Sequence, residues 1–205
     1  MHPRNLFVAV LLGVALSAGI WIALSIDSEP ERPLTATVLP SKTDVPAFQL
    51  VDDQGADIDE SVFRGQWDLV FFGFTHCPDI CPITLQVLAS ARSQLADEGQ
   101  SPLPRIVLVS VDPERDTPES LARYVGSFGD DTLGITGDIE QIRQLTDGLG
   151  VFFEKRDAQG DSDYYVVDHS SVVLVIDPDG RFHALFSSPH DIENFVHDLP
   201  ILLSS

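Results

Sequence analysis

Basic residues and cysteines are scarce in this sequence, and each shortage narrows the classes of function that remain. Of 205 residues, 12 are Lys or Arg, 32 are Asp or Glu and two are Cys, which gives a formal net charge of −20. Nucleic acid is therefore not an expected partner, because neutralising its phosphates requires a basic face. The length predicts one domain with appendages, and the charge predicts a well-solvated acidic surface.

One long apolar run is present near the start of the chain. The stretch from Leu6 to Ile26 carries no formal charge. At about 1.5 Å per residue, a helix of this length spans roughly 30 Å, the thickness of a bilayer core. Arg4 precedes the run and acidic residues follow it. Because positive charge favours the cytoplasmic side, we expect a cytoplasmic tail at residues 1–5, a transmembrane anchor at 6–26 and the rest of the chain outside.

A cleaved signal peptide is the competing interpretation of this run, because Ala23-Leu24-Ser25 resembles a small-residue cleavage site. The run is long for the core of a signal peptide, which favours a retained anchor. Too few residues precede it for a mitochondrial transit peptide. We therefore hypothesise a single-pass protein of the bacterial inner membrane with its C-terminal domain in the periplasm. Residues 27–46, in which prolines lie among polar residues, are expected to form a linker.

The remaining residues, 47–205, alternate between strand and helix patterns. The apolar run from Asp68 to Phe72 is typical of a strand buried on both faces. Apolar residues at helical spacing, beginning with Ile83, predict a helix from about Pro82 to Glu98. The other expected elements, in chain order, are a hairpin around 52–55, a strand at 106–111, a helix at 118–128 capped by Thr117, a helix at 139–149 capped by Asp138, a strand at 151–155, a hairpin of strands 171–176 and 181–186, and a helix at 191–203.

Strand, helix, strand and helix, followed by a hairpin and a closing helix, is the thioredoxin order. We therefore predict an α/β, thioredoxin-like fold with an extra N-terminal hairpin, in which helices cover a central sheet. In sheets of this kind a site forms beyond the carboxyl ends of the strands. Both cysteines, Cys77 and Cys81, lie just beyond the first core strand.

The cysteines belong to the segment Gly73-Phe-Thr-His-Cys-Pro-Asp-Ile-Cys-Pro82. We expect residues 77–81 to form a turn and the helix to start near Pro82, because proline suits the first helical position. The backbone N–H groups and the dipole of such a helix start lower a thiol pKa. The pair predicts a shared metal ion or a redox-active disulfide. A structural disulfide is the alternative, although closing so short a loop removes little chain entropy.

A third donor follows from the thioredoxin arrangement, in which the loop before the final hairpin faces the cysteine turn. In this chain that loop contains His169. Two thiolates and one imidazole form a soft, three-coordinate set that suits Cu(I) and accepts Cu(II) when an oxygen joins. Zinc accepts the same ligands but normally requires a fourth, and a histidine hydrogen-bonded to backbone is the alternative role for His169. We predict copper bound by Cys77, Cys81 and His169.

Two aspartates are candidates for orienting this site. Asp168 precedes the histidine, and a ligating histidine usually donates its other N–H to an oxygen. Asp112 ends the neighbouring strand at the same end of the sheet. Both are equally consistent with ordinary turn formers.

His76 directly precedes Cys77 and is a candidate for tuning that thiol electrostatically. We assign a structural role to His183 and surface positions to His190 and His197, which have no cysteine partner in sequence.

Three segments together resemble the Sco/SenC family: Gly73–Pro82, Ser110-Val-Asp-Pro-Glu-Arg-Asp-Thr-Pro118 and Val167-Asp-His-Ser170. The resemblance covers residues 45–203, and the three motifs in this order are specific. Members of this family are membrane-anchored, thioredoxin-fold proteins that serve cytochrome c oxidase assembly. Phe74 stands where many members have Tyr, and no ligand position departs from the family pattern.

The resemblance implies that Cys77, Cys81 and His169 bind one copper ion. It also implies that the partner is subunit II of cytochrome c oxidase, which carries the dinuclear CuA centre, and that other periplasmic copper carriers are further candidate partners. Two roles remain open. One is a copper chaperone without catalytic turnover, and the other is a thiol–disulfide oxidoreductase in which Cys77 and Cys81 reduce the CuA cysteines.

The presence of His169 favours the chaperone, because thiol exchange needs only the cysteines. A peroxidase is a weaker third interpretation. Peroxidatic sites usually place Pro and Thr ahead of a single reactive Cys, and here Thr75 lacks that Pro.

Overall fold

The computed structural model describes residues 11–19, 21, 32–157 and 165–204. The chain divides into two compact units, Met1–Arg32 and Pro33–Ser205. In the first unit, residues 11–19 and 21 are helical. Among the described residues, no helix is both long and apolar enough to cross a membrane. Much of the predicted anchor at 6–26 lies outside the described residues.

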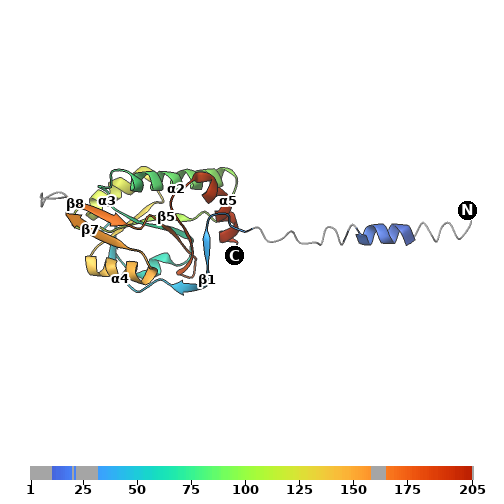
Figure 1. Cartoon of the computed structure of the whole chain (residues 1–205), viewed down its shortest axis with the longest axis horizontal. Coiled ribbons are helices and arrows are strands. Elements are labelled where there is room, and N and C mark those ends of the chain that lie inside the picture. The colour runs from blue at the N-terminus through green and yellow to red at the C-terminus, as the bar shows by residue number, and fades with distance from the viewer. Residues whose placement is uncertain (1–10, 20, 22–31, 158–164, 205) are drawn as a thin grey trace, which may run out of the picture. The chain divides into compact units, whose positions relative to one another are not determined.

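The second unit is built on an eight-stranded mixed sheet (Figure 1). Its strands lie in the order β1-β10-β9-β4-β5-β6-β2-β3. The bounds are β1 Thr37–Asp44, β2 Leu50–Asp52, β3 Asp57–Ile58, β4 Asp68–Gly73, β5 Arg105–Ser110, β6 Leu133–Thr136, β9 Val173–Ile176 and β10 Arg181–Phe186. A separate two-stranded sheet pairs β7, Phe153–Asp157, with β8, Tyr165–His169.

Four helices of this unit cover the sheet: α2 at Ile80–Asp97, α3 at Pro118–Val125, α4 at Ile139–Leu149 and α5 at Ile192–Leu203. Two short 3-10 helices, Glu60–Phe63 and Gly126–Phe128, complete the described elements. Helices α2, α3 and α5 lie on one side of the sheet, and α4 lies on the other (Figure 1). This arrangement is the α/β, thioredoxin-like fold that the sequence predicts.

The core forms around β4, the strand with the most continuous apolar sequence. All six of its residues are buried, and it pairs in parallel with β5 and antiparallel with β9. The helix ends also follow the sequence. Thr117 and Asp138 cap α3 and α4 by accepting backbone hydrogen bonds, and α4 stops at Gly150, whose φ of 70° suits glycine.

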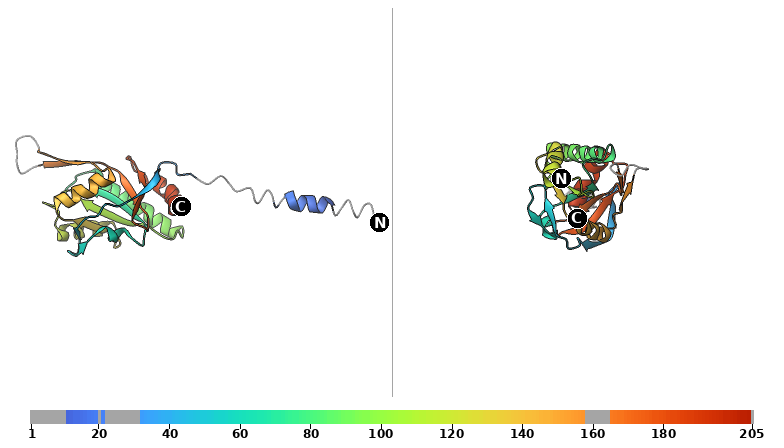
Figure 2. Two further views of the ribbon diagram at one scale, coloured as in Figure 1. Left: turned by 90° about the horizontal axis from the view of Figure 1, so that it is seen from below. Right: turned by 90° about the vertical axis from the view of Figure 1, so that its left-hand side faces the viewer.

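Three strands differ from the sequence-based expectation. Residues 37–44, assigned above to the linker, form β1 and pair with β10 at the edge of the sheet. The short strand β6 has no counterpart in the prediction. The predicted loop before the final hairpin is instead strand β8, which continues through His169 and pairs with β7. Figure 2 shows that the β7–β8 hairpin projects from one end of the domain.

Candidate metal centre

The two cysteines lie at the junction between β4 and α2. The amide of Cys77 donates to the Phe74 carbonyl oxygen at 3.3 Å, which closes a turn. The helix begins at Ile80, with Asp79 as its N-cap. The sequence analysis expected the helix to start near Pro82, and the structure corrects this start to two residues earlier. Cys81 therefore lies inside the first helical turn.

The two sulfur atoms are brought close together by this geometry. The Cys81 amide donates to Sγ of Cys77 at 3.4 Å, which satisfies one of the N–H groups that a helix start leaves unpaired. Cys81 is fully buried, whereas Cys77 is partly exposed, and both are thiols rather than a disulfide. Gly73 leaves the space that the Cys81 sulfur occupies, because a Cβ at Gly73 would lie 2.9 Å from it.

Burial changes the chemistry expected of Cys81. Its hydrogen bond with the Cys77 sulfur and its desolvation both raise the pKa of the Cys81 thiol, and they outweigh a backbone hydrogen bond from Phe74 that acts in the opposite direction. The prediction that the helix start lowers a thiol pKa is therefore wrong for Cys81. Cys81 carries its proton at neutral pH until a metal ion or an oxidising partner displaces it.

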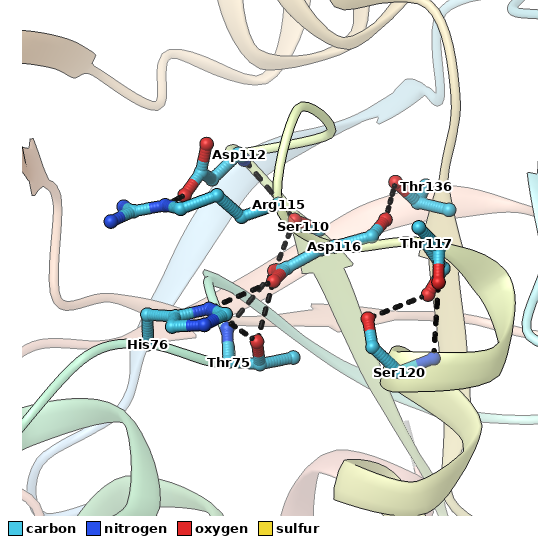
Figure 3. Close-up of polar contacts among 9 residues, drawn as sticks. All are labelled: Thr75, His76, Ser110, Asp112, Arg115, Asp116, Thr117, Ser120 and Thr136. Atoms are coloured by element: carbon cyan, nitrogen blue, oxygen red, sulfur yellow. Dashed lines mark hydrogen bonds and ion pairs between the residues drawn. The ribbon is translucent and has the colours of Figure 1, made fainter. Parts of the chain in front are cut away.

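Asp116 organises the turn that precedes the cysteines (Figure 3). Its carboxylate accepts hydrogen bonds from the Thr75 amide at 2.9 Å, the Thr75 hydroxyl at 2.5 Å and the Ser110 hydroxyl at 2.6 Å. His76 Nδ1 lies 3.7 Å from the same carboxylate. Asp116 is 1% exposed, so these contacts fix the start of the cysteine turn against the end of β5.

The sequence analysis missed Asp116, because an Asp in a loop rich in Pro and charge usually forms a turn. Only its contact with Thr75, far away in sequence, reveals its role. Asp112, which the sequence favoured, is buried and forms an ion pair with Arg115. The Arg115 guanidinium in turn lies 5.6 Å from the centre of the Phe74 ring. Asp112 thus supports the cysteine turn through Arg115.

The β7–β8 hairpin carries the third predicted ligand. In the strand register, His169 pairs with Phe153 and Asp168 with Glu154. The strand ends there, and the amide of Ser170 donates to the Phe152 carbonyl oxygen at 2.8 Å. The side chains of Asp168 and His169 lie outside the described part of the structure, so their roles stay predictions. Among the described side chains, no group of three or more His, Cys, Asp or Glu could hold a metal ion.

A buried phenol completes the surroundings of the cysteines. The hydroxyl of Tyr124, on α3, is inaccessible to solvent and has no hydrogen-bond partner among the described residues. Its burial raises the pKa of Tyr124, and the nearby sulfurs of Cys81 and Cys77 add to this effect. A hydroxyl in this position has unused capacity to donate a hydrogen bond.

The remaining histidines lie elsewhere. His183 is buried against Trp67, with ring centroids 5.5 Å apart. His190 and His197 are half-buried rather than on the surface. His190 contacts the Ser171 carbonyl oxygen at 2.9 Å, and His197 contacts the Asp198 carboxylate at 2.7 Å. These contacts give all three a structural role.

Fold and site together define a thioredoxin-like domain with a pair of neighbouring cysteines at the start of its first long helix. The model of the SCO1/SenC family matches residues 36–204 of this chain. The chain therefore belongs to the SCO1/SenC family.

Individual relatives agree with this assignment. The chain is 39% identical over 191 residues to "Protein SCO2 homolog, mitochondrial" of Bos taurus, with 92% of this chain and 71% of the relative covered. It is 34% identical over 169 residues to a "Putative copper-binding protein" of Stutzerimonas stutzeri, covering 82% of this chain and 81% of the relative. The crystal structure of Arabidopsis thaliana ScoI with copper bound superposes with a TM-score of 0.72 at 34% identity, covering 78% of this chain and 98% of that one.

Proposed function

We propose that this chain is a copper chaperone that binds one copper ion through Cys77, Cys81 and His169 and supports assembly of the CuA centre of cytochrome c oxidase. The observation that carries the proposal is the pair of thiols at the start of α2, one sulfur accepting the amide of the other cysteine at 3.4 Å. The copper-bound relative of similar fold supports the choice of metal. Subunit II of the oxidase is the proposed recipient.

The donor set fits copper better than harder metals. Thiolate sulfur is soft and favours Cu(I), and an imidazole nitrogen adds a donor that Cu(II) also accepts. Copper binding at Cys81 releases the proton that burial holds there. Asp116 keeps the cysteine turn in place, and the partial exposure of Cys77 gives a recipient access to one of the two sulfurs.

Copper loading before and after oxidation tests this proposal. The full-length chain in detergent, loaded anaerobically with Cu(I), should retain one copper per molecule after excess metal is removed. Closing a Cys77–Cys81 disulfide consumes both sulfurs and should abolish retention. Oxidised protein that retains as much copper as the reduced protein would show that the ligands lie elsewhere.

A thiol–disulfide oxidoreductase is the second candidate, and the proximity of the two cysteines, with the Cys81 amide 3.4 Å from Sγ of Cys77, supports it. In that role, the Cys77 thiolate attacks a disulfide of subunit II and releases one partner thiol. Cys81 then loses its proton and attacks Cys77, which releases the second partner thiol. Two electrons pass to the partner, and this chain leaves as a disulfide.

We also propose that residues 6–26 anchor the chain in the inner membrane, with residues 1–5 in the cytoplasm and the Pro33–Ser205 unit in the periplasm. The uncharged run and its flanking charges support this topology. A reporter that works only in the periplasm should be active when it is fused after Ser205. Activity of a reporter that works only in the cytoplasm would contradict the topology.

A further inference from the structure

The loop of residues 111–117, which joins β5 to α3 and is called here the bridging loop, contacts two parts of the candidate site. On one side it holds the cysteine turn. Asp116 accepts two hydrogen bonds from Thr75, and Arg115 stacks over Phe74. Phe74 and Thr75 lie just before Cys77 in the chain, and Figure 3 shows the hydrogen bonds between Thr75 and Asp116.

On its other side, the bridging loop contacts the β7–β8 hairpin. Glu114 Oε2 lies 2.7 Å from Nζ of Lys155, which is on β7. In the hairpin register Lys155 pairs with Val167, and Phe153 pairs with His169. The ion pair therefore joins the bridging loop to the hairpin two residue pairs away from the predicted histidine ligand.

The hairpin also packs into the core through Phe153 and Val167, which are 7% and 4% exposed. A cavity of about 440 Å³ lies between the bridging loop, the start of α4 and the hairpin, and its lining includes Glu114, Arg143, Phe153, Lys155 and Val167. Across the cavity, the Arg143 guanidinium lies 4.9 Å from the centre of the Phe153 ring. Since β7 and β8 form their own sheet, the hairpin position depends on side-chain contacts such as these.

We propose that Glu114 is a positioning residue that, through Lys155, sets where the hairpin places His169 relative to Cys77 and Cys81. The bridging loop then acts as one rigid link between the thiols and the histidine, held by Asp116 at one end and Glu114 at the other. This inference rests on the proposed copper ligands.

The expected effect is small and depends on salt. Glu114 and Lys155 are 68% and 42% exposed, and exposed ion pairs contribute little to stability. Loss of the pair should weaken Cu(II) binding by about two- to fivefold. Cu(I) binding should change less, because two thiolates hold Cu(I) without the imidazole. The effect should shrink at about 1 M salt, which screens exposed charges.

A charge-swap experiment tests the inference on the full-length chain in detergent. The variants are Glu114→Lys, Lys155→Glu and the double swap, and the matched control is Glu119→Gln, which removes an exposed carboxylate on α3. Cu(II) affinity is measured by competition, and hydrogen exchange of the β7 and β8 amides is measured without copper. Each single change should weaken Cu(II) binding and speed hairpin exchange, and the double swap should restore both.

Two results would overturn the inference: a double swap that restores neither measurement, or Glu114 variants that behave like Glu119→Gln. If His169→Ala binds Cu(II) as tightly as the parent protein does, the proposed ligand set is overturned instead. In that case the copper-free exchange measurement still decides whether Glu114 positions the hairpin.

Discussion

At the scale of single residues, the sulfur of Cys81 fits in its place because Gly73 has no side chain. An added Cβ would lie 2.9 Å from that sulfur, 3.0 Å from Cε1 of Phe71 and 3.3 Å from Cδ1 of Leu108. We expect Gly73→Ala to cost about 1–3 kcal/mol of unfolding free energy, as overpacking does, and to lower Cu(I) affinity by moving the sulfur. Chemical denaturation and Cu(I) competition measure both, and unchanged copper affinity would show that the sulfur does not need this space.

A second prediction at this scale follows from the buried hydroxyl of Tyr124. Because it has no hydrogen-bond partner among the described residues, Tyr124→Phe should leave the unfolding free energy unchanged or raise it by about 1 kcal/mol. Tyr124→Ala, the control, removes the ring and should cost about 3 kcal/mol. A clear loss of stability in Tyr124→Phe would contradict this account of the site.

The cysteine pair could be predicted from sequence, because a buried strand that breaks at Gly73 ahead of a helical pattern is a local signal. Asp116 could not, since its role consists of contacts with Thr75 and Ser110 that only the folded chain creates. The raised pKa of Cys81 was missed for a similar reason. The helix start is visible in sequence, whereas the depth of burial that opposes it is not.

At the scale of elements, α5 fixes the start of the domain through one carboxylate. Asp198 accepts hydrogen bonds at 2.8 Å from the amides of Leu34, Thr35 and Ala36, just before β1. Burial opposes its ionisation, but these bonds and His197 prevail and lower the pKa of Asp198 to about 2. This contact explains why residues 34–36, which the sequence analysis assigned to the linker, belong to the fold.

We expect Asp198→Asn to cost roughly 2 kcal/mol at neutral pH. The folded pKa lies below the unfolded value of about 4, so the carboxylate stabilises the fold above about pH 4 and loses this effect as the pH falls towards 2. Urea unfolding of parent and variant across this range measures the difference. The exposed Asp147→Asn is the control, and a stability gap that persists unchanged at pH 2 would contradict the assignment.

The elements that the sequence predicted correctly are those with strong local patterns. Strand β4 is continuously apolar, and α3 and α4 begin at a Thr and an Asp that cap them. Strand β1 was missed because its exposed, Pro40-containing sequence is tolerated only at a sheet edge, where it pairs irregularly with β10. In α2 the predicted apolar face is confirmed at Leu88, Ala91 and Leu95, which are buried, and is wrong at Ile83, which is 53% exposed.

At the scale of the whole molecule, a thioredoxin-like domain carries a pair of neighbouring cysteines, and the SCO1/SenC family model matches residues 36–204 of the chain. The order of elements made the fold predictable from the sequence. The strand pairing of β8 with β7 was not visible in the sequence, and the approach of His169 to the cysteine turn stays a prediction. The choice between copper delivery and thiol exchange therefore falls on one residue, His169.

Titration of His169→Ala with Cu(I) and Cu(II), beside the parent and with oxidase activity measured in the same strains at limiting copper, tests the central claim most directly. Removing the nitrogen donor should weaken Cu(I) binding only in part, because two thiolates still hold it, and should abolish most Cu(II) binding. Thiol exchange with a small disulfide should be unchanged, and oxidase assembly should fail. Unchanged binding of both copper ions would remove His169 from the site, and lost copper binding with full oxidase activity would contradict copper delivery as the function.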